Sequence, residues 1–585
     1  MSNPTPDPLP PDPDPPDPPE PTVVEPFPAA SAAASIDAPL AIKAELFAPT
    51  LGTPVRGPGQ AETAAAAPAG PRTAVRGQHN WVSIGPRNVG GRIRAIAVEP
   101  GDPKIMYAAP ASGGVFTSVD GGDSWFPLWH DEPSLSMAAL AISPSNQAVV
   151  WAGTGETQAG GGETIPANGV WRSPDRGATW RPPNAGESIL TARIHALAAH
   201  PTNDQVCWAA AGGPDGLYRT TDGGRTWTQF AAGRGFTDVR FARFGGALRL
   251  FAVLQGTVQI AGPPVANRGL LIRLDTPDDA DAVLSGVLDG VGPPDPLLAV
   301  GTTTPAPAPG LADPGFGKVA VYDGSAAAFP APVVFLAQTH GDRGATLRTD
   351  RSFVALLRCR DAHTATPTTM TFTAVPPAET FGAEGQGGYN IALAVSPTNP
   401  NHLAYGMVEL YLHRNANAAA PVAGDWLRAQ MWDLNIIDPG HHADHHDLIF
   451  APAPAAPFAN GVAGNALVLW DANDGGVSWC ADWATAVGYP VVDPADTGAP
   501  PRAQATALFP PTLNALTWRK RSHGISATQM YDLTQHPRLP SVIGCGFQDN
   551  GVWIGLSGPS WQLALTADGG FVAFDPDDPY RMLVT

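Results

Sequence analysis

The stretch Ser118-Val119-Asp120-Gly121-Gly122-Asp123-Ser124-Trp125 is the first of three copies of one eight-residue phrase. The phrase returns as SPDRGATW at 173–180 and as TTDGGRTW at 220–227, so the shared pattern is Ser/Thr-x-Asp-x-Gly-x-Ser/Thr-Trp. Each copy follows a short run of apolar and aromatic residues, and the copies recur about every fifty residues. Strand–turn–strand content with such a period predicts an all-β protein, a β-propeller built from four-stranded blades.

The chemistry of a tight turn explains the residues of this phrase. Its Asp can accept hydrogen bonds from backbone N–H groups a few residues further on, and its Gly can take a positive φ. Its Trp supplies an apolar face that packs the hairpin against its own sheet. A structural role is therefore predicted, in preference to catalysis, for one Asp and one Trp of each copy: Asp120 and Trp125, Asp175 and Trp180, Asp222 and Trp227.

A second recurring phrase, a short apolar run that ends at a proline, marks the inner strand of each blade. Its seven copies end at Pro100, Pro144, Pro201, Pro397, Pro452, Pro537 and Pro576. The stretch between Pro201 and Pro397 has room for three more blades, with an insertion at about 275–316, and a second insertion covers about 486–513. We therefore expect nine or ten inner strands, in one large ring or in two tandem propellers.

The two ends of the chain differ from the repeats. Residues 1–77 alternate Asp with Pro and then become rich in Ala, Pro and Gly, which predicts a disordered arm, either a spacer or a peptide ligand. Residues 78–585 form the predicted propeller, whose last unit is either incomplete or closed by a strand at 80–86. The N-terminus lacks the basic and apolar regions of a Sec signal, which predicts a cytoplasmic protein or export by another route.

Composition excludes several classes of protein. The net charge of −19 provides no electrostatic footprint for a nucleic acid. No apolar stretch reaches the length of a membrane span. The four cysteines, Cys207, Cys359, Cys480 and Cys545, are scattered without a Cys-x-x-Cys motif, which predicts free buried thiols in preference to disulfides.

Several segments resemble those of a known group of propellers. They are Gly85–Ile93, Ser112–Phe116, Gly153–Glu156, His442–His446, Asn473–Val477 and Gln548–Gly551. In this order they resemble the large bacterial Asp-box proteins, with the neuraminidase-type repeat, whose propellers are similar to that of sortilin. More distantly they resemble xyloglucanase-type glycoside hydrolases. The resemblance covers about 80–585 and implies more about the fold than about the chemistry. The first hypothesis for the function is a propeller that binds a glycan or a protein at the mouth of its channel.

The resemblance also has two departures. Xyloglucanase-type enzymes carry a catalytic Asp just before a Gly-Gly-aromatic strand of the first blade, where this chain has Ala111. Sialidases carry an Arg-Ile-Pro motif, whereas Arg92-Ile93-Arg94 lacks the proline. Two functions therefore stay open, a binding propeller without chemistry and a glycoside hydrolase. Hydrolysis needs two carboxylates roughly 5–10 Å apart, and the candidates are Glu156, Asp444, Asp447, Asp549 and Asp568.

The most concentrated cluster of chemistry-bearing residues is His441-His442-Ala443-Asp444-His445-His446-Asp447. Because side chains alternate along a strand, His442, Asp444 and His446 are expected on one face, where they could bind a divalent metal. The alternative is a polar channel mouth without metal. Residues six and eight positions before the strand-ending prolines should line that mouth, and those predicted to bind a ligand are Arg92, Arg94, Arg193, His195, Gln529 and Tyr531.

Overall fold

The computed structural model describes Val23–Val24 and most of residues 84–585. The gaps are 130–131, 157–166, 214, 234, 255–270, 279–313, 341–352, 366–369, 371, 377–388, 431–440, 455–466, 482, 485–517, 557, 566–567 and 579–580. The chain divides into two compact units. The ring unit comprises Leu51–Gln529 with Pro559–Trp561, and the two-sheet unit comprises Met530–Gly558 and Gln562–Thr585 with Met1–Thr50.

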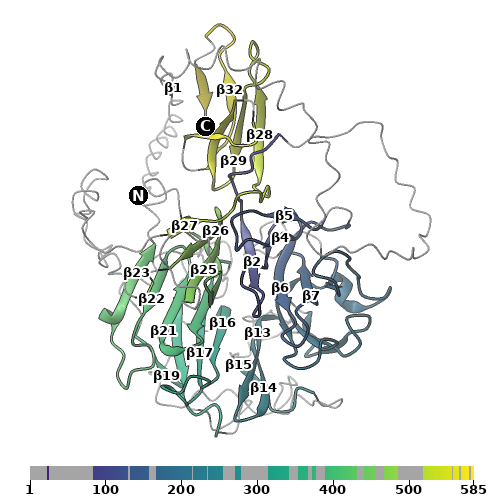
Figure 1. The fold of residues 1–585 in the computed structure, drawn as a ribbon, viewed down its shortest axis with the longest axis vertical. Helices are drawn as coiled ribbons and strands as arrows, with labels where there is room; N and C mark the ends of the chain where they lie inside the picture. The colour runs from purple at the N-terminus through teal and green to yellow at the C-terminus, as the bar shows by residue number, and fades with distance from the viewer. Residues whose placement is uncertain are drawn as a thin grey trace, which may run out of the picture. The chain divides into compact units, whose positions relative to one another are not determined.

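The ring unit is a closed seven-bladed propeller (Figure 1). Its inner strands β2, β6, β9, β13, β16, β20 and β24 pack side by side in chain order, and β24 packs against β2. The strands of the first three blades are β2 (Ile93–Val98), β3 (Met106–Pro110), β4 (Phe116–Ser118), β5 (Phe126–Pro127); β6 (Met137–Ile142), β7 (Val150–Thr154), β8 (Val170–Ser173); and β9 (Ile194–Ala199), β10 (Cys207–Ala211), β11 (Gly216–Thr220), β12 (Thr228–Phe230).

The remaining four blades complete the ring. Their strands are β13 (Phe236–Phe244), β14 (Ala247–Leu254), β15 (Leu271–Leu274); β16 (Pro314–Tyr322), β17 (Val333–His340), β18 (Phe353–Cys359), β19 (Phe372–Ala374); β20 (Ala392–Ser396), β21 (Asn399–Gly406), β22 (Leu410–His413), β23 (Trp426–Gln430); and β24 (His445–Pro452), β25 (Leu467–Asn473), β26 (Gly476–Cys480), β27 (Trp518–Lys520). Two short 3-10 helices among the described residues, Ser188–Thr191 and Ala423–Asp425, lie in connections.

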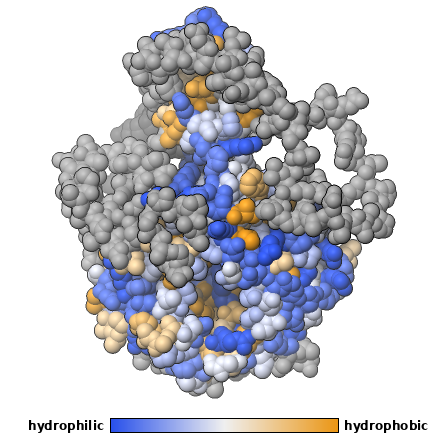
Figure 2. Space-filling view, in the orientation of Figure 1, coloured by the Kyte–Doolittle hydropathy of each residue, from blue (hydrophilic) through white to orange (hydrophobic). Residues whose placement is uncertain are grey.

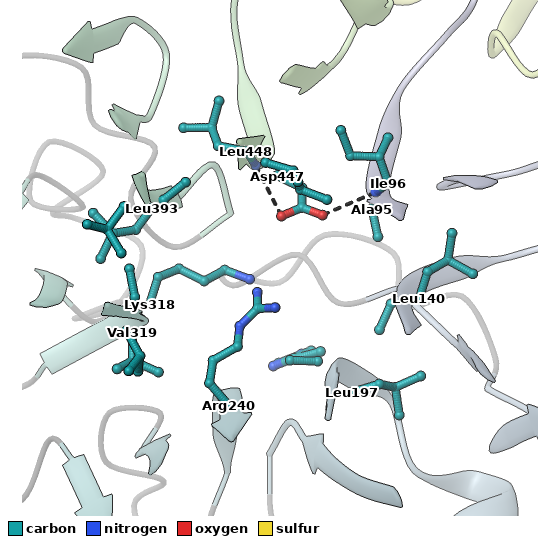
Figure 3. Close-up of a pocket in the computed structure, with 18 of the residues that line it drawn as sticks. Ala95, Ile96, Leu140, Leu197, Arg240, Lys318, Val319, Leu393, Asp447 and Leu448 are labelled. Carbon is teal, nitrogen blue, oxygen red and sulfur yellow. Dashed lines mark hydrogen bonds between the residues drawn. The ribbon is translucent and has the colours of Figure 1, made fainter. Parts of the chain in front are cut away.

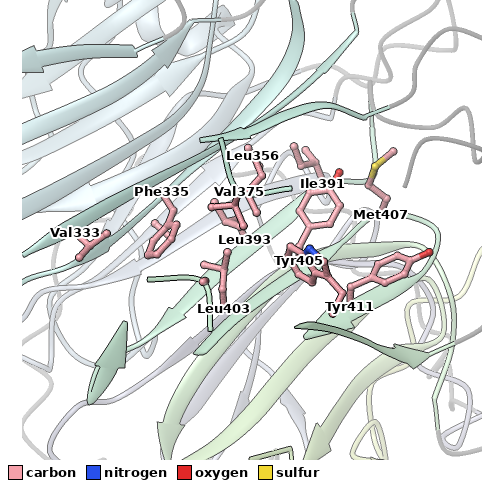
Figure 4. Packing of buried hydrophobic residues seen from close by; sticks show 14 of the residues in the cluster. Val333, Phe335, Leu356, Val375, Ile391, Leu393, Leu403, Tyr405, Met407 and Tyr411 are labelled. Carbon is pink, nitrogen blue, oxygen red and sulfur yellow. The ribbon is translucent and has the colours of Figure 1, made fainter. Parts of the chain in front are cut away.

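Apolar side chains fill the space between neighbouring blades. Phe335 of β17, Leu393 of β20 and Tyr405 of β21 belong to one such cluster, between the fifth and sixth blades (Figure 4). At the closure of the ring, Ile96 of β2 shares a cluster with Trp470 of β25. The visible surface of the described residues, in contrast, is mainly hydrophilic, with apolar residues in patches (Figure 2). Burial of apolar area between the blades therefore supplies the main stabilisation of the ring.

The three repeated phrases form hairpins after the third strand of blades one to three. In the first, Asp120 accepts hydrogen bonds from the Ser118 hydroxyl at 2.8 Å and from the Ser124 backbone N–H at 2.9 Å. Asp175 and Asp222 make the same two kinds of hydrogen bond, at 2.8–3.0 Å. Each carboxylate is thus committed to its own turn, at the outer side of its blade.

The two-sheet unit contains two further antiparallel sheets. Their strands are β28 (Met530–Gln535), β29 (Ile543–Phe547), β30 (Gly551–Gly555) and β31 (Gln562–Leu565), and β32 (Val572–Phe574) and β33 (Met582–Val584) with β1 (Val23–Val24) at the edge. β28 packs against β32 as one inner strand against the next. The Val23–Val24 pair matches Leu583 and Met582 in register; the rest of the arm predicted over 1–77 lies outside the described residues.

The predicted fold class is confirmed, and the described residues form nine inner strands, seven in the ring and two in the two-sheet unit. One large ring is excluded, because the ring closes after seven blades. The expectation of three blades between Pro201 and Pro397 is wrong: there are two, because β13, β14, β16 and β17 are eight or nine residues long and take up the extra sequence.

Other expectations concern the termini, the insertions and the cysteines. Of the strand expected at 80–86, only Ile84–Pro86 is described, and it belongs to no strand. Most of the insertion at 275–316 and all of that at 486–513 lie outside the described residues. All four cysteines are free and buried, as predicted. None of the described helices has the length and apolar character that crossing a membrane requires.

Candidate functional site

A cavity of about 330 Å³ occupies the centre of the ring unit (Figure 3). All seven inner strands contribute to its wall. Most of the lining residues are apolar, among them Ile96, Leu140 and Leu197, but Arg94, His195, Arg240, Lys318 and Asp447 also face the cavity. The ring therefore encloses a channel that carries a small number of polar groups at defined positions, as ligand pockets do.

Six side chains from four blades meet where the inner strands begin, and we name them the mouth cluster: Arg92, Arg94, Glu156, Tyr389, His446 and Asp474. Arg94 is their centre. Its Nη1 lies 2.5 Å from His446 Nδ1, and its Nε lies 4.0 Å from Glu156 Oε1. Its guanidinium carbon also lies 4.2 Å from the centre of the Tyr389 ring. The cluster thus links residues that are up to 382 positions apart along the chain.

The contacts of His446 define its protonation. Since an arginine N–H can only donate, His446 Nδ1 accepts from Arg94 and the proton resides on Nε2, which donates to Asp474 Oδ1 at 2.5 Å. Burial, followed by the charge of Arg94, lowers the pKa of His446 to about 3. His446 is therefore a neutral imidazole that bridges a cation and an anion.

The two carboxylates of the mouth cluster are shifted in opposite directions. Burial raises the pKa of Glu156, although Arg94 and Arg92 oppose the shift, and the Tyr389 hydroxyl donates to Glu156 Oε1. Burial would also raise the pKa of Asp474, but Arg92, with its Nε at 2.9 Å from Oδ1, and His446 hold that pKa below its usual range. The buried environment therefore disfavours the ionised form of Glu156, whereas the partners of Asp474 favour its ionised form.

The register of the strands relates Asp474 to the departure at Ala111. In the first blade Ile93 pairs with Pro110, and the N–H of the next residue, Ala111, donates to the Arg92 carbonyl. In the seventh blade His445 pairs with Asn473, and the next residue is Asp474. Asp474 therefore has the same register position in the seventh blade as Ala111 has in the first, and these two blades meet where the ring closes. The carboxylate of Asp474 accepts a hydrogen bond from the side chain of Arg92.

The residues of the predicted metal triad have different surroundings. The strand begins only at His445, and Asp444 has a positive φ of 64°, so the expected alternation does not extend back to His442. His442 Nδ1 lies 3.0 Å from its neighbour's carbonyl, Asp444 accepts from Asn390, and His446 belongs to the mouth cluster. The structure does not gather these three side chains, and metal binding by them stays a prediction.

A different set from the same segment does converge. Within the described residues, the His/Cys/Asp/Glu group whose ligand atoms all lie within 4.8 Å of one another is His441, His445 and Asp471. His441 Nε2 lies 2.7 Å and His445 Nδ1 2.9 Å from the two oxygens of Asp471, and His441 stacks on Trp518 with ring centres 3.8 Å apart. Two imidazole N–H groups donating to one carboxylate satisfy this buried group without a metal.

The other predicted binding residues fall into two groups. His195 lines the cavity, and its Nδ1 donates to the Phe236 carbonyl at 3.1 Å; burial lowers its pKa to about 3. Arg193 lies beside Gly155 and Gly213 in the ring unit. Gln529 is exposed at the end of that unit. Tyr531, Asp549 and Asp568 belong to the two-sheet unit, where Asp568 accepts the Asp549 N–H at 2.8 Å.

Sequence reasoning missed three charged residues of the channel interior: Asp238, Arg240 and Lys318. Positions were counted back from a strand-ending proline, and β13 and β16 lack that proline. A weaker signal was present, because Asp238 and Arg240 alternate with Val239 and Phe241, and because Lys318 begins the apolar run Val319-Ala320-Val321. A charge within an apolar strand of a ring predicts a side chain that faces the channel.

The fold and the site define this protein as a β-propeller with a polar channel mouth. Comparisons of the chain with known proteins agree with this class. None of the known protein-family models matches the chain. The xyloglucanase Xgh74A of Acetivibrio thermocellus is 28% identical over 172 residues, which cover 23% of this chain and 19% of that enzyme. A xyloglucanase of Hypocrea jecorina is 27% identical over 168 residues, 26% of this chain and 19% of that protein.

Solved structures give a similar result over a longer part of the chain. The GH74 enzyme of Niastella koreensis superposes with a TM-score of 0.51 at 15% identity, over 84% of this chain and 63% of the enzyme. The GH74 xyloglucanase of Xanthomonas campestris gives 0.50 at 15% identity, over 85% and 71%. The fold of this chain is thus similar to that of xyloglucanase propellers, although the match spans about a fifth of each curated relative.

Proposed function

We propose that this protein is a glycoside hydrolase that cleaves a xyloglucan-like polysaccharide at the mouth of the ring channel. The observation that carries the proposal is the opposite shift of two carboxylates in one cluster, a raised pKa at Glu156 and a lowered pKa at Asp474. Glycoside hydrolysis needs one protonated and one ionised carboxyl group, and environments that separate their pKa values assign the two roles. Glu156 is the proposed general acid and Asp474 the proposed anionic partner.

The surroundings of the pair fit a sugar substrate. Tyr389 contributes an aromatic ring, and the guanidinium carbons of Arg92 and Arg94 lie 5.2 Å and 4.2 Å from its centre. Aromatic faces pack against sugar rings, and arginine N–H groups donate to hydroxyl oxygens. The similarity of fold and of a short sequence segment to xyloglucanases supports the choice of polysaccharide.

A second candidate function is recognition of a glycan or protein ligand without hydrolysis. Ala111 favours it, because it stands where xyloglucanase-type enzymes carry a catalytic Asp. The internal partners of Asp474, Arg92 and His446, also favour it, because a structural ion pair needs no substrate.

The test measures release of reducing ends from xyloglucan by the full chain, together with xyloglucan binding. Glu156→Gln and Asp474→Asn should each lower kcat by roughly 10²–10⁴-fold, the usual contribution of acid–base catalysis, with binding retained. Asp577→Asn is the matched control, because that side chain is 94% exposed. Unfolding temperatures identify a variant that has lost activity by losing its fold.

The outcomes separate the two candidates. Hydrolysis by the parent that survives both substitutions would overturn the assignment of the pair. Binding without any hydrolysis by the parent would replace the enzyme by the binding propeller. If the parent neither binds nor hydrolyses xyloglucan, xyloglucan is not the ligand.

A further inference from the structure

Two cationic side chains point into the interior of the channel from different blades. Lys318 of β16 and Arg240 of β13 extend toward each other across the cavity (Figure 3). Within the part of the chain that the structure describes, no hydrogen bond or ion pair is formed by the Lys318 ammonium. The Arg240 Nε lies 3.3 Å from Asp238 Oδ1, and the Arg240 side chain is 44% exposed in the cavity. Both side chains therefore keep N–H donors that face the cavity.

The two nearby carboxylates, Asp447 and Asp238, accept hydrogen bonds from backbone N–H groups. Asp447 accepts the N–H groups of Leu448 and of Ile96, each at 3.1 Å. Asp238 accepts those of Val239 at 3.0 Å and Val319 at 2.9 Å. In each case the second donor belongs to the next blade. These carboxylates hold neighbouring inner strands together, and they act on Lys318 only through their charge.

The remaining polar groups of the cavity leave Lys318 without a contacting counter-ion, whereas Arg240 has one in Asp238. Arg94 is engaged by His446 and Glu156, and His195 stays neutral. Arg240 and Lys318 repel each other, and burial, opposed by Asp238 and Asp447, lowers the pKa of Lys318. Enclosing an ammonium that lacks a contacting partner is costly, so the site favours a bound anion.

We propose that the interior of the ring channel binds a small oxyanion, a carboxylate or a phosphate, between Lys318 and Arg240. A cavity of about 330 Å³ accommodates such a molecule. Lys318 supplies a point charge with rotatable donors, and Arg240 supplies a planar fork that matches two oxygens of one anionic group. Apolar walls, which include Leu140, Leu197 and Leu393, strengthen the attraction by lowering the local dielectric. The site is distinct from Glu156 and Asp474 and does not depend on hydrolysis.

The test is thermal unfolding and titration calorimetry of the full chain with inorganic phosphate, citrate or chloride at one ionic strength. Phosphate or citrate, or both, should raise the unfolding temperature and give a saturable heat, and the responding anion identifies the source of the oxyanion. Lys318→Met should lose at least tenfold in affinity. Lys104→Met, in the turn before β3, is the control and should bind like the parent.

Three results would overturn the proposal: no saturable binding of phosphate or citrate by the parent, equal shifts with chloride, or unchanged affinity in Lys318→Met. Because Lys318→Met removes a charge that lacks a contacting partner, it should fold at least as stably as the parent. If it does not, Arg240→Gln is the second variant, with the same tenfold loss expected.

Discussion

In both the ring unit and the two-sheet unit, an Asp of one inner strand accepts a backbone N–H of the next inner strand, but the strands differ in burial. In the ring, Asp447 of β24 accepts the Ile96 N–H of the next inner strand at 3.1 Å. In the two-sheet unit, Asp532 of β28 accepts the Val572 N–H of β32 at 3.0 Å. Yet most of β24 is buried, whereas Tyr531 and Leu533 of β28 are 50% and 53% exposed.

The same hydrogen bond between neighbouring inner strands thus forms in both units, but the inner strands are buried only where the ring of blades is closed. Each inner strand of the ring packs between two others, so both of its sides are covered. Among the described inner strands of the two-sheet unit, β28 has one inner-strand neighbour, β32, and β32 has one, β28. The enclosed, water-poor environment that shifts the pKa values of Glu156 and His446 is thus a property of the closed ring.

The largest expected effect compares two phenylalanines. Phe335 is fully buried between the fifth and sixth blades (Figure 4), whereas Phe571 of the two-sheet unit is 70% exposed. Phe335→Ala should lower the free energy of unfolding by about 3–5 kcal/mol, because it leaves a cavity. Phe571→Ala should change it by about 0.5 kcal/mol or less. Urea unfolding of both variants measures the difference, and equal losses would show that closure does not govern burial.

An intermediate effect compares the two bridging aspartates. Asp447→Ala leaves the Ile96 N–H unpaired inside the ring, which should cost about 1–3 kcal/mol. Asp532→Ala should cost less, because water can reach the half-buried site. Hydrogen exchange of the Ile96 and Val572 amides reports each bond separately. A larger loss at Asp532 would contradict the comparison.

The smallest effect, counted per histidine and per pH unit, is the dependence of ring stability on pH. The folded-state pKa values of His195 and His446 are about 3, below the ordinary value of 6.5. The unfolded chain therefore binds more protons between these values, so stability is complete above pH 6.5 and falls as pH decreases toward 3. Each histidine contributes a slope of up to about 1.4 kcal/mol per pH unit. Denaturant unfolding at pH 7, 6 and 5 should show a shallower slope in His446→Gln, and an unchanged slope would refute its burial as a neutral imidazole.

Much of the fold was predictable because its signals are local. The Asp120 turn carries all its hydrogen-bonding partners within eight residues, and the run Ala95–Pro100 carries both the apolar strand and its stop. The number of blades between Pro201 and Pro397 was not predictable, since strand length replaced the proline signal there.

The candidate site was predictable only in part. Arg92, Arg94 and His446 were placed at the mouth by counting along each blade. The pairing of His446 with Asp474 follows from the register of β24 and β25. The contacts of these two residues with Arg92 and Arg94 depend on the closure of the seventh blade against the first, which no local pattern encodes. The positions of Lys318 and Arg240 depend in the same way on how the ring closes.

The central claim is that the mouth of the closed ring binds the polysaccharide. Hydrogen–deuterium exchange of the full chain, with and without xyloglucan oligosaccharides, tests it most directly. We expect slower exchange in peptides that contain Arg92 and Arg94, Tyr389 and His446, and no change in β28–β33. Protection confined to β28–β33, or no protection anywhere at saturating oligosaccharide, would contradict it.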